Sequence, residues 1–245
     1  AAIASSLAEM GSLIVLCIYT KAKIDKDKYG LKPVYDGRLL IKVLNLSVWS
    51  MLHAFISVAP WFLFFVAIEH LGKTELAISN ITRSVSAIFF VIANSFAVTT
   101  GSLVSNVIGA GARNELFPIC HKVLKLGYAV GIPFVVVALL CNRWIVSFYT
   151  DNELLIELAF APFVVMILNY TFALPGYVYL NAVGGTGKNK ITFLFQVTTT
   201  CVYLVYLYWL SFCIKASLSL YLTAEYLFVI LLALQSIIYL KSKHY

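Results

Sequence analysis

The sequence has 245 residues, of which 61% are hydrophobic and 12% are charged, and its formal net charge is +7. A soluble domain is nearer half apolar and a quarter charged, so this composition, with a mean hydropathy of +0.90, excludes a soluble globular protein. The apolar runs are continuous over about twenty residues instead of alternating over ten, which predicts an all-α integral membrane protein. Five cysteines without CxxC spacing indicate neither a zinc site nor a disulfide framework, so any metal site is unknown.

Seven membrane-spanning helices are predicted, at residues 1–20, 43–68, 78–108, 123–140, 154–180, 191–210 and 218–240. The first run starts inside an apolar stretch without a basic segment or cleavage site before it, so we do not interpret it as a signal peptide. We expect it to be preceded by further chain. Residues 21–42 form a long, basic segment, and we place a domain boundary there.

The positive charges alternate between the two ends of the predicted helices. Lys and Arg number 14 on the side that carries the 21–42 segment and the C-terminus, and 3 on the other side. Because Lys and Arg in short loops mark the cytoplasmic side, we predict a cytoplasmic C-terminus in a multi-pass protein of the cell membrane, with a bacterial inner membrane favoured. This placement explains the net charge without a nucleic-acid partner.

Two glycine-rich stretches follow long apolar helices. Gly184–Lys188 is similar to a phosphate-binding loop, but that pattern needs Gly at Ala182 and Ser or Thr at Asn189. We therefore interpret it, like Gly109-Ala-Gly111, as a tight turn in which Gly ends a helix. No HExxH or GxSxG motif occurs, and the sequence indicates no enzyme and no cofactor.

Polar residues recur inside the predicted helices and are the candidates for a substrate cavity. They are Ser50, His53, Ser57, Asn94, Asn169, Tyr177, Gln196 and Tyr203. Hydroxyls, amides and aromatic rings together suit a weakly polar or cationic small molecule. Interhelical hydrogen bonding and interfacial tyrosines remain an alternative explanation of the same residues.

Arg83 is an intramembrane charge within the third predicted span. A central intramembrane Arg costs about 2.5–3.5 kcal/mol on insertion scales. We expect Arg83 to extend toward the outer surface or to pair with Glu69 or Glu75.

The order of these features resembles the multidrug and toxic compound extrusion (MATE) transporters. The resemblance rests on SNVIGAGARNEL after the third span, FYTDNE before the fifth, and the turn from Asn181 to Gly187. It implies that residues 1–20 are the last helix of a missing N-terminal lobe, residues 21–42 the cytoplasmic inter-lobe loop, and residues 43–245 a six-helix C-terminal lobe.

The resemblance also implies a function. The family exports cationic or amphiphilic compounds, including drugs and toxins, by antiport coupled to Na⁺ or H⁺ with alternating access. A single lobe surrounded by membrane lipid is then expected not to transport by itself. The coupling carboxylate is not identified, because spans two and five offer His53, Ser57, Asn169 and Thr171 where some branches carry an acid.

Two other classes remain open. A lipid-linked oligosaccharide flippase of the same superfamily is the main alternative, although a pyrophosphate would require several cationic cavity residues and only Arg83 is a candidate. A seven-span membrane enzyme or receptor is disfavoured because no catalytic constellation occurs.

The charge asymmetry predicts which turns face the cytoplasm. In a background without the five native cysteines, single cysteines at Asn114, Asn189 and Ser242 should react only from the cytoplasmic side. Cysteines at Lys73 and Asn152 should react only from outside. The measurement is labelling of intact cells and of inverted vesicles by a membrane-impermeant maleimide, and mixed labelling within either set contradicts the topology.

Overall fold

The computed structural model describes residues 2–23, 36–214 and 216–242. The chain divides into two compact units, Ala1–Leu44 and Asn45–Tyr245. The first unit contains α1 (Ala2–Lys23) and the beginning of α2 (Gly37–Ile68). The other helices belong to the second unit, which contains the candidate functional site.

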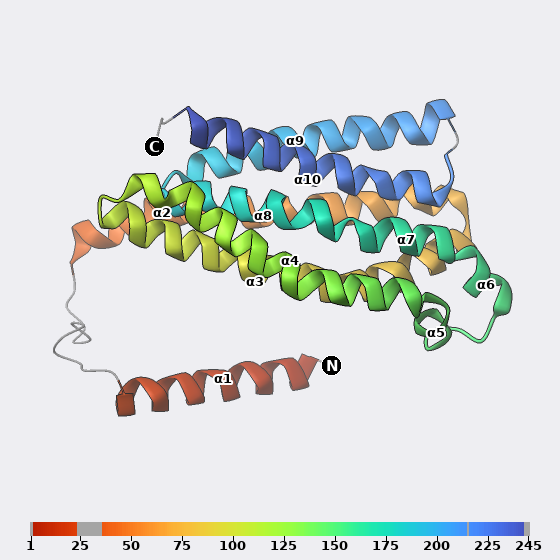
Figure 1. The fold of residues 1–245 in the computed structure, drawn as a ribbon, viewed down its shortest axis with the longest axis horizontal. Helices are drawn as coiled ribbons and strands as arrows, with labels where there is room; N and C mark the ends of the chain where they lie inside the picture. Colours follow the sequence, from red (N-terminus) through yellow and green to blue (C-terminus); the bar gives the residue numbers. More distant parts are fainter. Residues whose placement is uncertain (1, 24–35, 215, 243–245) are drawn as a thin grey trace. The chain divides into compact units, whose positions relative to one another are not determined.

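The second unit continues α2 into a short 3-10 turn and then runs through a series of long helices (Figure 1). Their bounds are η1 Glu69–Leu71, α3 Lys73–Gly109, η2 Arg113–Glu115, α4 Leu116–Leu140, α5 Asn142–Ser147, α6 Glu153–Leu158, α7 Phe160–Leu168, α8 Tyr170–Gly185, α9 Asn189–Trp209, the π-helical turn η3 Leu210–Ile214, and α10 Leu218–Lys241. Within the described residues, six stretches are long and apolar enough to cross a membrane: Gly37–Leu71, Lys73–Gly109, Arg113–Leu140, Glu153–Gly185, Asn189–Phe212 and Leu218–Lys241. The chain is therefore a multi-pass membrane protein, as predicted, and α1 is not among these six stretches.

The start of α2 differs from the sequence prediction. The helix begins at Gly37, whereas the apolar pattern placed its start at residue 43 and assigned 37–42 to a loop. Asp36 explains the difference, because its carboxylate accepts hydrogen bonds from the Arg38 and Leu39 backbone N–H groups at 2.9 and 3.2 Å and so caps the first turn. The expected loop residues 24–35 lie outside the described residues.

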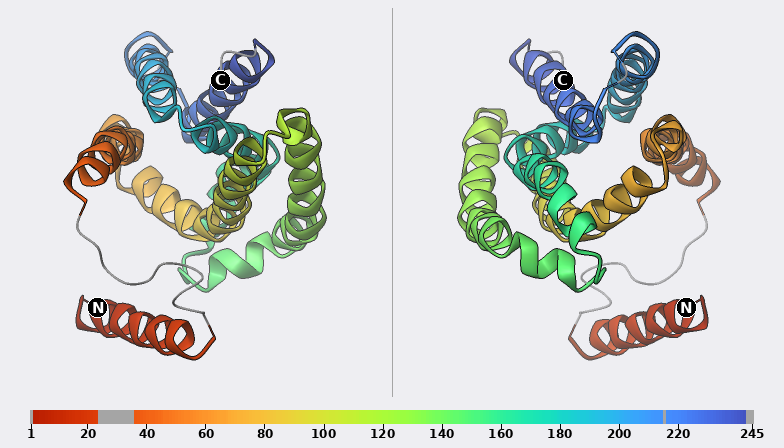
Figure 2. Two further views of the ribbon diagram at one scale, coloured as in Figure 1. Left: turned by 90° about the vertical axis from the view of Figure 1, so that its left-hand side faces the viewer. Right: turned by 90° about the vertical axis from the view of Figure 1, so that its right-hand side faces the viewer.

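Helix α8 is the central helix of the second unit, and it packs against α3, α4, α9 and α10 (Figure 2). Two of its glycines allow backbones to approach closely. A Cβ added at Gly176 would lie 2.7 Å from the Val229 carbonyl oxygen of α10, and one at Gly185 would lie 2.5 Å from the Gly101 carbonyl oxygen of α3. Small residues at such crossings are typical of helix packing in membranes, where van der Waals contact drives association.

Tyrosine hydroxyls satisfy backbone carbonyls across helices. Pro175 inside α8 has no N–H, which leaves the Thr171 carbonyl without its helical donor. The Tyr128 hydroxyl of α4 donates to that carbonyl at 2.7 Å, and the Tyr170 hydroxyl donates to the Gly127 carbonyl, also at 2.7 Å. These bonds join α4 to α8 where lipid offers no alternative donor.

The two glycine-rich stretches are turns between helices. Helix α3 ends at Gly109 and Gly111 follows at φ 76°, while α8 ends at Gly185 and Gly187 follows at φ 81°. Positive φ is favourable for Gly and strained for residues with a Cβ. Both stretches follow helices and not strands, so the phosphate-loop interpretation of Gly184–Lys188 is excluded.

The close contact between α8 and α10 predicts that Gly176→Ala destabilises the fold. The new methyl group would overlap a backbone carbonyl, so the two helices must separate, at a cost of about 1–3 kcal/mol. The measurement is the thermal unfolding midpoint in detergent. Gly184→Ala is the matched control, because its Cβ would meet its nearest neighbours at 3.8 Å; equal midpoints for the two variants would contradict the packing argument.

Candidate functional site

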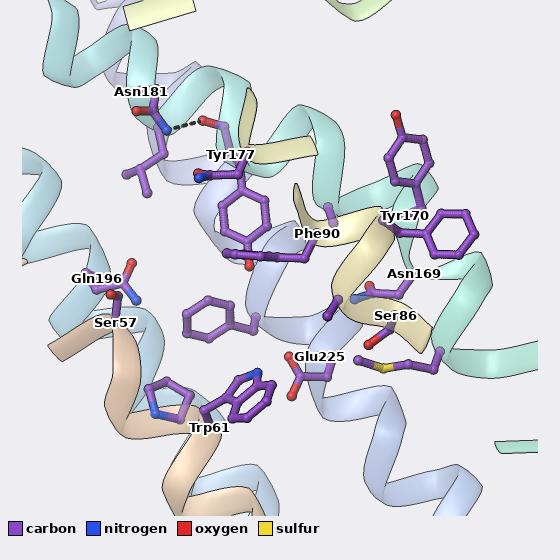
Figure 3. Close-up of a pocket in the computed structure, with 18 of the residues that line it drawn as sticks. Ser57, Trp61, Ser86, Phe90, Asn169, Tyr170, Tyr177, Asn181, Gln196 and Glu225 are labelled. Carbon is purple, nitrogen blue, oxygen red and sulfur yellow. Dashed lines mark hydrogen bonds between the residues drawn. The ribbon is translucent and has the colours of Figure 1, made fainter. Parts of the chain in front are cut away.

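A pocket of about 350 Å³ lies within the second unit, among α2, α3, α7, α8, α9 and α10 (Figure 3). Polar groups and aromatic rings line it together. The lining residues are His53, Ser57, Pro60, Trp61, Ser86, Ala87, Phe89, Phe90, Asn94, Met166, Asn169, Tyr170, Ala173, Tyr177, Leu180, Asn181, Gln196, Glu225 and Phe228. Its volume lies at the lower end of the range typical of small-molecule sites.

The pocket collects six of the eight cavity candidates from the sequence. They come from α2, α3, α8, α9 and the junction between α7 and α8, and they are His53, Ser57, Asn94, Asn169, Tyr177 and Gln196. Gln196 is 3% exposed, and the Asn169 Oδ1 atom is buried without a hydrogen-bond partner among the described residues. A buried amide oxygen of this kind can accept a hydrogen bond from a bound molecule.

The other two candidates do not line the pocket. Ser50 lies nearer the start of α2, where its hydroxyl accepts a hydrogen bond from Asn189 Nδ2 at 2.9 Å. Trp49 beside it packs on Phe193 with 5.6 Å between ring centroids, and Lys190 Nζ lies 5.3 Å from the Trp49 ring. These contacts join α2 to the first turn of α9. Ser50 therefore takes part in the contact between α2 and α9.

Tyr203 is fully buried and contacts the pocket only through the lining residues Glu225 and Phe228. Its hydroxyl donates to Glu225 Oε1 at 3.2 Å, and its ring packs edge-on against Phe228. Tyr203 therefore positions the Glu225 carboxylate without lining the pocket.

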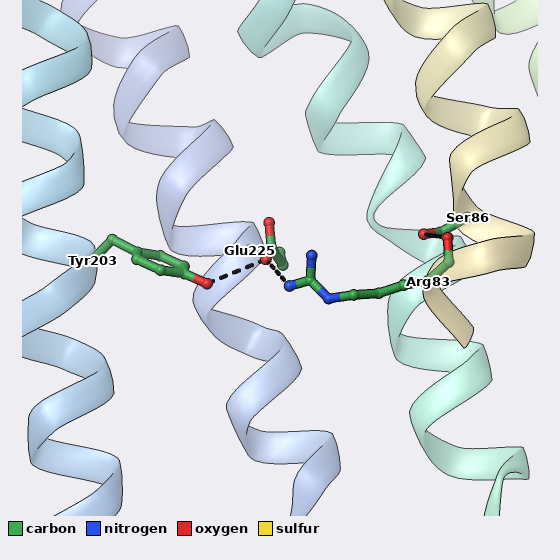
Figure 4. Close-up of polar contacts among 4 residues, drawn as sticks. All are labelled: Arg83, Ser86, Tyr203 and Glu225. Carbon is green, nitrogen blue, oxygen red and sulfur yellow. Dashed lines mark hydrogen bonds and ion pairs between the residues drawn. The ribbon is translucent and has the colours of Figure 1, made fainter. Parts of the chain in front are cut away.

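The most polar contact beside the pocket is an ion pair between α3 and α10 (Figure 4). Arg83 Nη2 lies 2.6 Å from Glu225 Oε1, and the side chains are 2% and 14% exposed. Because the same oxygen accepts from Tyr203, three helices meet at this carboxylate. A charged, hydrogen-bonded pair is the arrangement that makes two ionised groups tolerable in an apolar interior.

Aromatic rings of α2 surround the other side of the Arg83 guanidinium. Its central carbon lies 4.1 Å from the ring centroid of Phe64, 5.1 Å from that of Trp61 and 5.3 Å from that of Phe65. Among the described residues, the Nε and Nη1 atoms have no hydrogen-bond acceptor. Cation–π attraction to these rings thus replaces part of the hydration that Arg83 loses.

The expectation that Arg83 pairs with Glu69 or Glu75 is wrong. Glu75 lies eight residues earlier on α3, which is about 12 Å along the helix axis. Glu69 belongs to the exposed η1 turn. Arg83 instead faces the interior of the second unit, where its guanidinium reaches the Glu225 carboxylate.

Glu225 is absent from the candidates that the sequence provided, although a signal for it was present. It lies eight residues into the apolar run of α10, and an ionisable residue inside a membrane span is a functional candidate by default. The family resemblance instead directed attention to carboxylates in the second and fifth spans.

Among the described residues, no group of three or more His, Cys, Asp or Glu side chains is placed to hold a metal ion.

The ion pair predicts strongly non-additive mutations. Arg83→Met and Glu225→Gln should each lower the free energy of unfolding by about 3–5 kcal/mol, because each leaves a buried group unpaired. The double variant Arg83→Met/Glu225→Gln should recover most of that loss. The measurement is SDS titration in mixed micelles, with exposed Arg143→Met as the control. Additive losses in the double variant would contradict the coupling.

Solved structures with a similar fold are MATE proteins. A crystal structure of MATE in complex with MaL6 matches with a TM-score of 0.79 and 16% identity, over 95% of this chain and 54% of that one. A crystal structure of MATE in the bent conformation matches with a TM-score of 0.71 and 16% identity, over 80% of this chain and 44% of that one. A crystal structure of a MATE point mutant gives a TM-score of 0.67 at 17% identity, over 80% of this chain and 43% of that one.

The chain spans about half the length of the solved structures it matches. No curated protein matches its sequence. The MatE family model matches residues 50–210, which include all but one of the helices that line the pocket. The chain therefore belongs to the MatE family.

Proposed function

We propose that this chain forms one lobe of an exporter that moves cationic or amphiphilic small molecules across the membrane in exchange for Na⁺ or H⁺. The observation that carries the proposal is the pocket, in which the Glu225 carboxylate and several aromatic rings face the same space. A carboxylate attracts a cation, and aromatic faces add cation–π attraction. Transport fits this site better than catalysis, because its polar groups come from several helices, and the Ser57 hydroxyl, one turn from His53, donates to the Ala54 carbonyl and not to that imidazole.

The aromatic groups give the pocket its affinity for an apolar or weakly polar body. Phe90 and Tyr177 pack edge to face with 5.6 Å between ring centroids, and Trp61 lies across from them on α2 (Figure 3). Amides of Asn169 and Gln196 supply hydrogen bonds from two other directions. The combination suits a bulky molecule with one charged group better than a small, highly hydrated ion.

The alternative, a flippase for lipid-linked oligosaccharides, receives less support. None of the described residues that line the pocket is Lys or Arg. Arg83 lies beside the pocket, but its charge is committed to Glu225 at 2.6 Å. A pyrophosphate would therefore find no free cation among the described lining residues to offset its charge.

We further propose that export requires a second lobe facing this pocket, with alternating access between the two. Substrate sites of such transporters lie at the interface between repeats. The solved MATE structures are about twice as long as the part they share with this chain, which supports the idea. The coupling ion would be exchanged at a carboxylate, and Glu225 is the one that this chain offers to the pocket.

The proposed location is the cell membrane, with the C-terminus in the cytoplasm. The turns that carry Arg113 and Lys188, and the end of α10 at Lys241, lie at one end of the second unit (Figure 1). This end carries the excess of positive charge that marks a cytoplasmic face.

The proposed function predicts that Gln196→Leu impairs export by the complete protein while its expression stays unchanged. Gln196 contributes an amide to the pocket, and an apolar side chain of similar size cannot hydrogen-bond the substrate, so the initial efflux rate should fall about tenfold. The measurement is gradient-driven efflux of a fluorescent organic cation from proteoliposomes. Cys201→Leu is the matched control, since Cys201 is exposed on the same helix and does not line the pocket. Equal rates for Gln196→Leu and wild type would overturn the assignment of the pocket.

A further inference from the structure

Two serine hydroxyls that line the pocket have already used their hydrogens within their own helices. Ser57 donates to the Ala54 carbonyl of α2 at 2.7 Å, and Ser86 donates to the Arg83 carbonyl of α3 at 2.9 Å. Each hydroxyl oxygen then has only its lone pairs left for the pocket. A bound molecule can therefore donate hydrogen bonds to these two oxygens but receives none from them.

Asn169 adds a further acceptor to the lining. The residue is 8% exposed, and its Oδ1 atom has no hydrogen-bond partner among the residues that the structure describes. A buried amide oxygen without a donor is unfavourable in an apolar interior. Because Asn169 lines the pocket, a molecule bound there is placed to supply the missing donor.

Glu225 is the charged acceptor of the pocket. Its Oε1 atom accepts hydrogen bonds from Arg83 Nη2 at 2.6 Å and from the Tyr203 hydroxyl at 3.2 Å. The two oxygens of a carboxylate together have about four acceptor positions, so these two bonds leave acceptor positions for a bound molecule.

Ser86, Asn169 and Glu225 lie on the same side of the pocket (Figure 3). Ser86 follows Arg83 by one turn of α3, and the Arg83 side chain reaches Glu225. The tyrosine that follows Glu225 on α10 donates its hydroxyl to the Val165 carbonyl of α7, and Asn169 comes one turn after Val165. A hydroxyl oxygen, an amide oxygen and a carboxylate thus face one part of the pocket.

The other polar groups of the lining do not offset these acceptors. Trp61, through its indole N–H, is the one purely donating side chain among the described lining residues. Asn181 already donates one amide hydrogen to the Tyr177 carbonyl at 3.0 Å. Side chains that can both donate and accept are His53, Asn94, Tyr177, Asn181 and Gln196. The lining therefore favours a ligand that brings several hydrogen-bond donors.

We propose that Glu225, Asn169 and Ser86 form a subsite for a protonated primary amine, whose three N–H donors match the three acceptors. The inference rests on the proposed export of cations and adds a selectivity to it: an ammonium group with N–H donors is preferred to a quaternary ammonium group on the same molecule. A trimethylated nitrogen carries the same charge and the same cation–π attraction, but it leaves the acceptors without donors. Hydrogen-bond donors, and not charge, make the distinction.

The size of the pocket favours an organic ammonium ion over a metal ion at these oxygens. The pocket has a volume of about 350 Å³, and the rings of Trp61, Phe90 and Tyr177 line it together with the acceptors. A bare Na⁺ would leave most of this space and all of these rings without a contact. A primary amine attached to an aromatic or aliphatic body uses both.

The test compares two probes that differ only in methylation, tritiated naphthylethylammonium and its trimethylammonium derivative. Equilibrium binding of each is measured on the complete protein in lipid nanodiscs at neutral pH, where both probes are fully charged, and binding to empty nanodiscs is subtracted. We expect the primary amine to bind wild type about tenfold more tightly, because hydrogen bonds to a charged group contribute at least that much.

Two variants test the named acceptors without changing a charge. Asn169→Leu and Ser86→Ala should each weaken binding of the primary amine about tenfold and leave the Kd of the trimethyl probe as in wild type. A general loss of structure would weaken both probes alike. Asn80→Leu, the same change at an exposed position of α3 that does not line the pocket, should leave both Kd values unchanged. Ser86→Ala decides the matter when Asn169→Leu fails to fold.

The outcomes separate this inference from the proposed function. Equal Kd values for the two probes in wild type, or a preference that both variants retain, would overturn the subsite and leave export of cations standing. Saturable binding of radioactive Na⁺ that Asn169→Leu abolishes, together with equal Kd values, would assign these oxygens to a metal ion and also overturn it. A preference that follows both variants supports the subsite by itself, and absence of gradient-driven efflux would then refute the proposed export alone.

Discussion

The Arg83–Glu225 ion pair is the interaction on which the arrangement around the pocket depends. A single charge in this apolar interior would be strongly unfavourable, so each partner requires the other at hydrogen-bond distance. The pair joins α3 to α10, Tyr203 adds α9, and the rings of Trp61, Phe64 and Phe65 add α2. These contacts therefore hold α2, α3, α9 and α10 together beside the pocket.

A different kind of contact holds α8 to its neighbours α3, α4 and α10. Gly176 and Gly185 let the α8 backbone approach α10 and α3, and Tyr128 and Tyr170 donate to carbonyls across α4 and α8. In lipid, such polar groups must be satisfied within the protein. In the pocket, the Asn169 Oδ1 atom has no hydrogen-bond partner among the described residues.

Helix α2 stands apart from this close packing. It is joined to α9 near its start by Ser50 and Trp49, and to the Arg83 guanidinium near its end by aromatic rings. Between these contacts, His53, Ser57 and Trp61 face the pocket, and Pro60 interrupts the helical hydrogen bonds. Helix α2 is thus held at two places, and Pro60 weakens its helical hydrogen bonding between them.

The sequence by itself determined the membrane class, six of its seven predicted spanning helices and the glycine turns, because apolar length and a positive φ at glycine are local properties. It also identified most of the polar groups around the pocket, since a polar residue inside a span faces the protein interior. Only the tertiary structure decided that Arg83 pairs with Glu225, 142 residues away, and that Ser50 and Tyr203 lie outside the pocket. The physical reason is that the depth and rotation of each helix against its neighbours are set by packing between distant segments, which the periodicity of one helix does not contain.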